Sequence, residues 1–231
     1  MNYKSTERYI TEIQLPRETR TYKPIPHEMV IDLVREGSLK AGLKIKEEVF
    51  SAAKDGNIAY GKHIFDQGDG EMNLQIVWTN SYDKSKRLSV ALASNVIVCG
   101  NGMISSKNIY YFNKKHTGEI QTFAPVEMIE YINRAEEIFS SLQGERERMK
   151  SIEIDSRLTS ELVGRIYMEH DFLSATNLSI LKREIEHPTY NYGADGSLWE
   201  LYNNVTFSIG GIHPAHWMQD HLDAHDFFVD V

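Results

Sequence analysis

Cysteine is nearly absent from this sequence of 231 residues, which contains only Cys99. An internal disulfide is therefore excluded, and a reducing compartment is expected. Long apolar runs are also missing: none approaches the roughly 18 residues of a membrane-spanning helix, and the polar start is unlike a signal peptide. We therefore expect a cytoplasmic protein that makes no contact with a membrane.

Positive charge is scarce in the second half of the chain. The formal net charge is -8, from 25 Lys and Arg against 33 Asp and Glu. Residues 1–125 contain 17 basic and 14 acidic side chains, whereas residues 126–231 contain 8 basic and 19 acidic ones. A polyanion, if it binds, is expected to contact the N-terminal half, although helix surfaces rich in Glu give the same asymmetry.

The spacing of apolar residues in the first half is typical of strands. Residues 1–25 predict an irregular arm, and residues 28–36 predict a helix that ends at Gly37. Short alternating segments then follow one another between tight turns such as Asp55-Gly56, which predicts an antiparallel β-meander of about five strands. The five segments cover residues 43–50, 58–65, 72–79, 88–93 and 108–113, and the fourth is followed by a short apolar stretch at residues 96–99.

After Pro125 the spacing is helical to the end of the chain. Helices are expected over residues 126–149, from residue 159, and over residues 175–186, 198–208 and 214–228. Strands followed by helices indicate an α+β fold. We expect a helix and sheet in residues 26–125, and a helical region in residues 126–231 that packs on the sheet as one domain.

Basic and aromatic residues alternate around two of the predicted turns. This pattern suits single-stranded nucleic acid, because cations bind phosphates and rings stack on bases. The alternative is that the aromatic residues face the core while the lysines keep the strand ends soluble. The predicted surface comprises Lys84, Lys86, Arg87, Lys107, Tyr110, Tyr111, Lys114, Lys115 and His116.

Histidines are concentrated in an acidic C-terminal segment. His221 and His225 are four residues apart on one helical face, so with His216 they form a candidate zinc or other transition-metal site. The alternative is that these histidines are ordinary surface or interface residues. We expect no cofactor. Because these histidines, with His187 and His213, lie among six acidic residues, we also expect raised pKa values and a subunit contact that loosens above neutral pH.

Three segments resemble the signatures of a known family. They are NVIVCGNGM at residues 95–103, KHTGEI at residues 115–120 and SLWELYNNVT at residues 197–206. In this order they resemble the phage/plasmid-like protein family catalogued as a domain of unknown function (932). An Arg that is usual in the family before the first signature is replaced here by Ser94 or Asn95. The resemblance implies a phage, plasmid or prophage setting and no particular reaction.

Three functions are compatible with these patterns. The leading hypothesis is a phage or mobile-element protein without catalytic activity that binds single-stranded DNA, as a homo-oligomer, in DNA metabolism. The sequence pI of about 5.6 argues against it, since nucleic-acid-binding domains are usually basic. The alternative is a phage-encoded protein that inhibits a host defence or nucleic-acid enzyme through its acidic C-terminal surface, in the host cytoplasm. The third is a metal-dependent enzyme that uses the C-terminal histidines.

Overall fold

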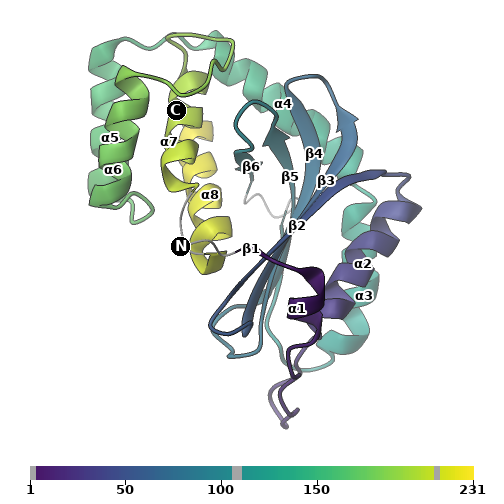
Figure 1. The fold of residues 1–231 in the computed structure, drawn as a ribbon. Coiled ribbons are helices and arrows are strands. Elements are labelled where there is room, and N and C mark those ends of the chain that lie inside the picture. The colour runs from purple at the N-terminus through teal and green to yellow at the C-terminus, as the bar shows by residue number, and fades with distance from the viewer. Residues whose placement is uncertain (1–3, 106–110, 211–213) are drawn as a thin grey trace.

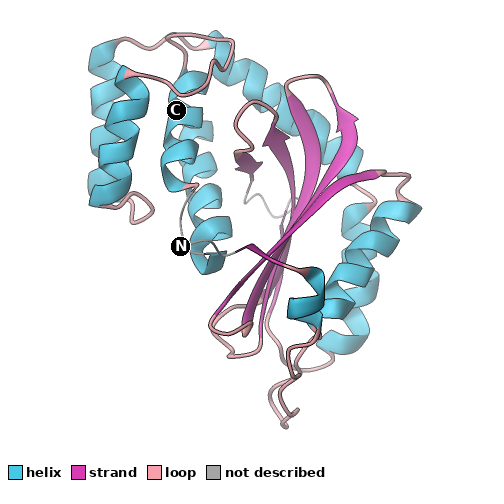
Figure 2. Cartoon of the chain, viewed as in Figure 1, coloured by secondary structure: helices cyan, strands magenta, loops and turns pink. Residues whose placement is uncertain are grey.

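The computed structural model describes residues 4–105, 111–210 and 214–231 (Figure 1). In this part of the chain an antiparallel sheet lies between helices on both of its sides (Figure 2). The predicted α+β architecture, a β-meander followed by helices that pack against it, is confirmed.

The central part of the sheet is built from consecutive hairpins. The described strands are β1 (Lys4–Ser5), β2 (Ile45–Ala53), β3 (Ile58–Gly68), β4 (Met72–Ser81), β5 (Leu88–Val96), β6 (Gly102–Ile104) and β7 (Tyr111–Lys114). Their order is β1-β2-β3-β4-β5-β6, and β7 also pairs with β5. The turn from β2 to β3 contains Lys54, Asp55 and Gly56, all with positive φ, which is the conformation that the Asp-Gly pair predicts.

Helices form a layer on each side of this sheet. The described helices are α1 (Glu7–Thr11), α2 (His27–Lys40), α3 (Ile120–Ile132), α4 (Ala135–Ser151), α5 (Ser156–Glu169), α6 (Ala175–Glu186), α7 (Leu198–Ile209) and α8 (Pro214–Val229). α2 and α3 lie on one side and α8 on the other, with α7 beside α8 (Figure 1). None of the helices in the described ranges combines the length and the apolar composition that crossing a bilayer requires.

The central strands are buried on both faces. Every residue of β4 and of β5 is buried. Ile76 and Trp78 belong to the larger core, which includes residues of α2, α3 and α4. Val77, on the opposite face, belongs to a smaller core with Trp217 and Leu222 of α8. The alternation along β4 therefore separates two cores rather than core and solvent.

The N-terminal arm is more ordered than the sequence suggests. It contains β1, which pairs with β2, and α1, whereas residues 12–26 contain no helix or strand. Arg35 of α2 holds α1 in place, because its two terminal nitrogens lie 2.7 and 2.8 Å from the carboxylate oxygens of Glu7. The prediction of a wholly irregular arm is therefore wrong for residues 4–11.

The predicted helix over residues 126–149 is two helices. α3 begins at Ile120, so Pro125 lies inside it and removes only one backbone donor. Burial of Ile120 and Ala124 keeps this first part of α3 helical. The chain then breaks at Asn133 and Arg134, and α4 follows.

Candidate nucleic-acid interface

Five of the predicted basic residues lie at one end of the sheet. β7 pairs with the start of β5 so that Lys114 lies opposite Leu88. Arg87 directly precedes Leu88, and Lys115 directly follows Lys114. Lys84 and Lys86 lie in the turn before β5. We call Lys84, Lys86, Arg87, Lys114 and Lys115 the basic end. Strand pairing thus brings together two segments that are separate in the sequence.

Most of the charge of the basic end is not neutralised by ion pairs. Lys114 is paired, since its Nζ lies 2.7 Å from Oε2 of Glu127. The Lys84 ammonium lies 4.7 Å from the centre of the Tyr22 ring. Within the described ranges, Lys84, Lys86, Arg87 and Lys115 form no ion pair. Cations without a carboxylate partner remain available to a phosphate chain.

A polar hollow of about 230 Å³ opens beside the basic end. It is lined by Thr79, Ser85, Lys86, Arg87, Ser89, Asn113, Met218 and Gln219. Asp220, the next residue along α8, is half-buried, and burial together with the charge of Asp223 raises its pKa to about 6, while Lys86 opposes this rise. The hollow therefore combines two cations with hydroxyl and amide groups, which is a suitable environment for an anion.

His116 does not belong to this surface. It is buried, and its Nε2 lies 2.7 Å from Oδ1 of Asn80, to which it donates. Burial lowers its pKa. His116 therefore fixes the segment after β7 and positions Lys114 and Lys115, rather than contacting a ligand.

The aromatic part of the predicted surface is not tested by the structure. Lys107 and Tyr110 lie outside the described residues. Tyr111 begins β7, opposite Ala91 of β5. Base stacking by Tyr110 or Tyr111 stays a prediction.

A buried polar network holds the basic end to the rest of the fold. Asn80 Nδ2 donates to the carbonyl oxygen of Ile25 at 2.7 Å and to Nδ1 of His27 at 3.0 Å. His27 Nε2 in turn donates to the carbonyl oxygen of Gly56 at 3.1 Å, and its ring stacks on Tyr82 with centroids 3.8 Å apart. The sequence does not predict this network, because an Asn at the end of a strand is typical of a turn.

Two of the three segments that resemble family signatures, residues 95–103 and 197–206, contact each other in the fold. Asn101, in the loop between β5 and β6, donates from Nδ2 to the carbonyl oxygen of Asn203 at 3.1 Å and to Oγ1 of Thr206 at 3.2 Å.

Over residues 15–210 the chain matches the family described as a domain of unknown function (DUF932). The chain belongs to this family. Searches of curated proteins and of solved structures gave no match.

Two of the C-terminal histidines of this DUF932 protein, His221 and His225, are buried. His221 is fully buried, its Nδ1 donates to the carbonyl oxygen of Trp217 at 2.9 Å, and the two rings are stacked. Burial lowers the pKa of His221 to about 3, so the predicted rise is wrong for this residue. The reason is that α8 packs on the sheet: desolvation of the ring outweighs its hydrogen bond to the Trp217 carbonyl, and the charge of Lys62 lowers the pKa further.

The predicted metal ligands are not brought together. His216 is exposed, whereas His225 is buried with its Nε2 3.0 Å from Oε2 of Glu145 in α4. His213 lies outside the described residues. Among the residues that are described, no three His, Cys, Asp or Glu side chains lie where they could hold a metal ion.

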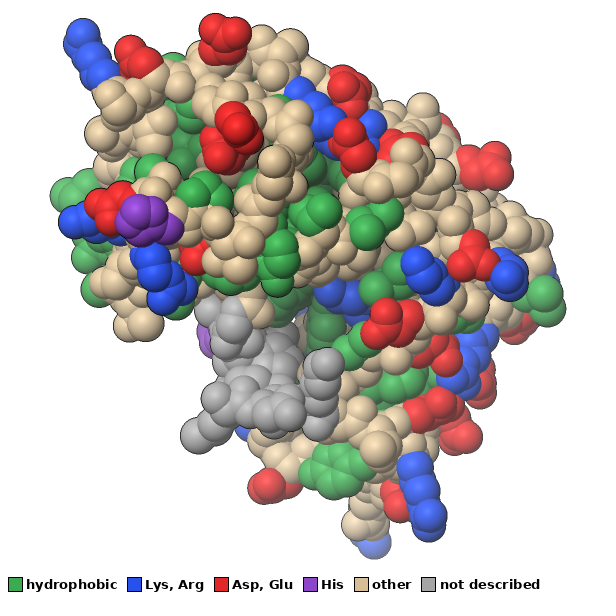
Figure 3. All heavy atoms as spheres, turned by 45° about the horizontal axis from the view of Figure 1, so that its top comes forward, with side chains coloured by type: hydrophobic (Ala, Val, Ile, Leu, Met, Phe, Trp, Pro, Cys, Tyr) green, Lys and Arg blue, Asp and Glu red, His purple; other side chains and the backbone are tan. Residues whose placement is uncertain are grey.

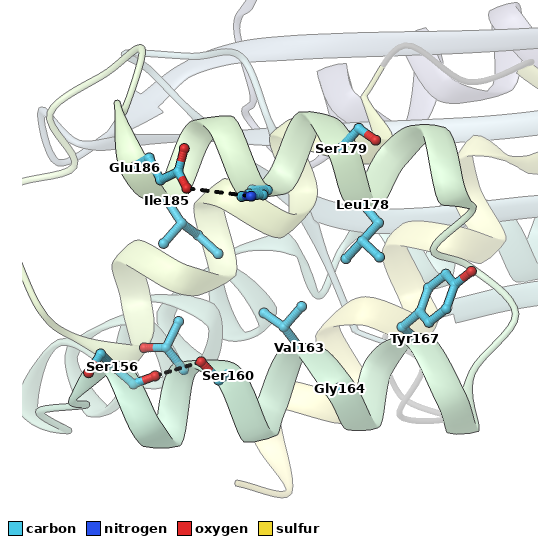
Figure 4. A pocket seen from close by; sticks show the side chains of 11 residues that line it. Ser156, Ser160, Val163, Gly164, Tyr167, Leu178, Ser179, Ile185 and Glu186 are labelled. Carbon is cyan, nitrogen blue, oxygen red and sulfur yellow. Dashed lines mark hydrogen bonds and ion pairs between the residues drawn. The ribbon is translucent and has the colours of Figure 1, made fainter.

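An apolar groove of about 650 Å³ lies between α5 and α6 of the DUF932 fold. Val163 and Tyr167 project from α5 toward Leu178 and Ile185 of α6 (Figure 4). On the face shown in Figure 3, acidic and basic side chains are interspersed with apolar ones, without an extended area of one sign. Neither the groove between α5 and α6 nor the face in Figure 3 has the concentration of positive charge that binding of a nucleic acid requires.

Two buried histidines predict that acid destabilises the protein. Burial holds the pKa of His27 at about 4 and that of His221 at about 3, below the ordinary histidine value of 6.5. The unfolded chain therefore binds more protons than the folded chain, and the free energy of unfolding falls by a few kcal/mol (on the order of 1.4 kcal/mol for each unit of pKa difference) as the pH drops from about 6.5 to 4. The raised pKa of Asp220 acts in the opposite direction with a smaller shift. Urea unfolding at pH 7 and pH 4.5 measures the difference, and equal midpoints would contradict it.

Proposed function

We propose that this protein binds single-stranded nucleic acid at its basic end. The observation that carries the proposal is the group of four cations, Lys84, Lys86, Arg87 and Lys115, that form no ion pair with any described residue. The polar hollow beside them adds neutral donors for phosphate oxygens. Because the net charge of the chain is -8, a polyanion would be repelled from much of the remaining surface, which confines binding to this end.

The proposed role is binding without catalysis, in the DNA metabolism of a phage or another mobile element. The proposed binding surface lies at the ends of two paired strands, β5 and β7, and in one tight turn, which suits it to hold a nucleic-acid strand in an extended form. Binding by several copies along one strand is the form that cooperative single-strand binding proteins take. Assembly of the protein as a homo-oligomer along the bound strand is part of this proposal.

Removing two of the unpaired cations is expected to weaken binding and reduce its dependence on salt. Binding of fluorescent oligo(dT) is measured by anisotropy over a range of salt concentrations. The variant R87Q/K115Q should bind about tenfold more weakly at low salt, and the slope of log K against log salt should fall by about 1.4, since each phosphate contact on a single strand contributes about 0.7.

The matched control is K40Q/K182Q, which removes the same charge from exposed sites on α2 and α6. It should leave both affinity and slope nearly unchanged. Equal losses in the two variants would show a nonspecific charge effect and contradict the proposal. If the wild type shows no salt-sensitive binding, the inhibitor of a host enzyme becomes the preferred hypothesis.

A further inference from the structure

A further cavity, of about 680 Å³, lies beside the contact between residues 95–103 and 197–206, the two segments that resemble family signatures. Its wall is formed by the loop with Cys99 and Asn101, by the first turn of α6, and by the start of α8. This volume is within the range of about 300–1,000 Å³ that is typical of sites for small ligands. Met218 and Gln219 of α8 line the polar hollow, whereas Trp217 and His221 line this cavity, so the two openings are separate.

The lining of this cavity carries positive charge only. Lys62 of β3 and Arg183 of α6 both contribute, and no carboxylate is among its described lining residues. Lys62 Nζ lies 3.3 Å from the carbonyl oxygen of Gly100, and Arg183 Nη2 lies 3.4 Å from Oε1 of the buried Glu184. A cavity lined by two cationic side chains and by no described carboxylate favours an anion.

The first turn of α6 adds backbone donors to the same wall. Ser174 caps α6 by accepting from the backbone N–H of Asn177, and Thr176 lines the cavity. The first N–H groups of a helix have no partner within it, and the helix dipole favours a negative charge there. Phosphate groups are commonly bound in this way.

His221 supplies a hydrogen-bond acceptor that has no partner. Its Nδ1 carries the proton, since that atom donates to the carbonyl oxygen of Trp217. Its Nε2 is therefore an acceptor, and this buried atom has no hydrogen-bond partner in the part of the chain that the structure describes. A buried acceptor without a partner is costly, and a donor from a ligand in the cavity that His221 lines would satisfy it.

We propose that this cavity binds a phosphorylated small molecule of nucleotide size, with its phosphate between Lys62, Arg183 and the start of α6, and a hydroxyl or amino group donating to His221. The site is a binding site rather than a place of covalent chemistry. Burial raises the pKa of the Cys99 thiol to about 11, which keeps this lining residue in its unreactive protonated form.

Calorimetry with three probes, AMP, ribose 5-phosphate and inorganic phosphate, tests this proposal, and adenosine serves as the neutral comparison. We expect saturable binding of a phosphorylated probe and at least about tenfold weaker binding of adenosine. R183Q should weaken binding of the phosphorylated probe about tenfold, as expected for loss of a charge-assisted hydrogen bond. K182Q, at the preceding and exposed position on α6, should leave it unchanged.

A second measurement reports on His221 directly. The Nε2 nitrogen resonance should move toward that of a hydrogen-bonded acceptor when the probe binds, while the ring stays neutral. Failure of all three phosphorylated probes to bind, or equal effects of R183Q and K182Q, would overturn the proposal. Because R183Q leaves the basic end intact, oligo(dT) binding should persist in this variant, so the two proposals fail separately.

Discussion

Replacing Asn80 by leucine is expected to lower the free energy of unfolding by about 4 kcal/mol, because three buried groups lose their partner at a cost of about 1–3 kcal/mol each. These groups are the carbonyl oxygen of Ile25, Nδ1 of His27 and the N–H of His116. Leucine has a similar size, so the loss is one of hydrogen bonding rather than of volume. The total stability of a domain is about 5–15 kcal/mol, so this variant should be only marginally folded.

Urea unfolding followed by circular dichroism measures the effect. N133L is the control, since Asn133 is exposed at the end of α3. It should change stability by less than about 0.5 kcal/mol. A loss below about 1 kcal/mol in N80L would show that water replaces the missing partner, and would contradict the role given to Asn80.

The variant G102A is expected to lose about 2–3 kcal/mol of stability, since overpacking of a filled core costs about this much. A Cβ at Gly102 would lie 2.6 Å from Cη2 of Trp217, and 3.2 Å from Nε2 of Gln75. The methyl group therefore pushes the start of α8 away from the sheet. Gly102 belongs to the first resembling segment, and this contact explains why a glycine is needed there.

A double-mutant cycle separates this contact from a general effect of alanine. In a W217L background, which removes the indole ring, G102A should cost less than in the wild type. G144A is the control, because a Cβ at Gly144 of α4 meets nothing within 4 Å. That change should stabilise the protein by about 0.4–1 kcal/mol. Equal effects of G102A in both backgrounds would contradict the proposed clash.

The sequence predicts those features of the fold that depend on neighbouring residues. Ser174 and Ser197 cap α6 and α7 because each side chain bonds a backbone N–H three residues ahead. The Asp55-Gly56 turn is also confirmed, because its conformation depends on two adjacent residues that tolerate positive φ. By contrast, the network around Asn80 joins residues that are 53 and 36 positions away, and no local pattern specifies such partners.

The candidate nucleic-acid interface shows the same difference between features set by neighbouring residues and features set by distant ones. Lys84, Lys86 and Arg87 lie close together in the sequence, so their clustering is predicted directly. That Lys114 and Lys115 join them depends on the pairing of β7 with β5, which the alternating pattern permits but does not specify. The burial of His221 could not be predicted, because a helix with acidic residues does not reveal that its other face covers a sheet.

The position of α8 determines how much of this chain must be made before it can fold. The family region ends at residue 210, before α8 begins. Until the last residues of α8 leave the ribosome, the sheet face with Val77, Ala91 and Ile104 has no helix to cover it. Chaperones and neighbouring chains can bind such an apolar face during synthesis. A fragment cut at the family boundary would retain this exposed face permanently, and it would be expected to aggregate.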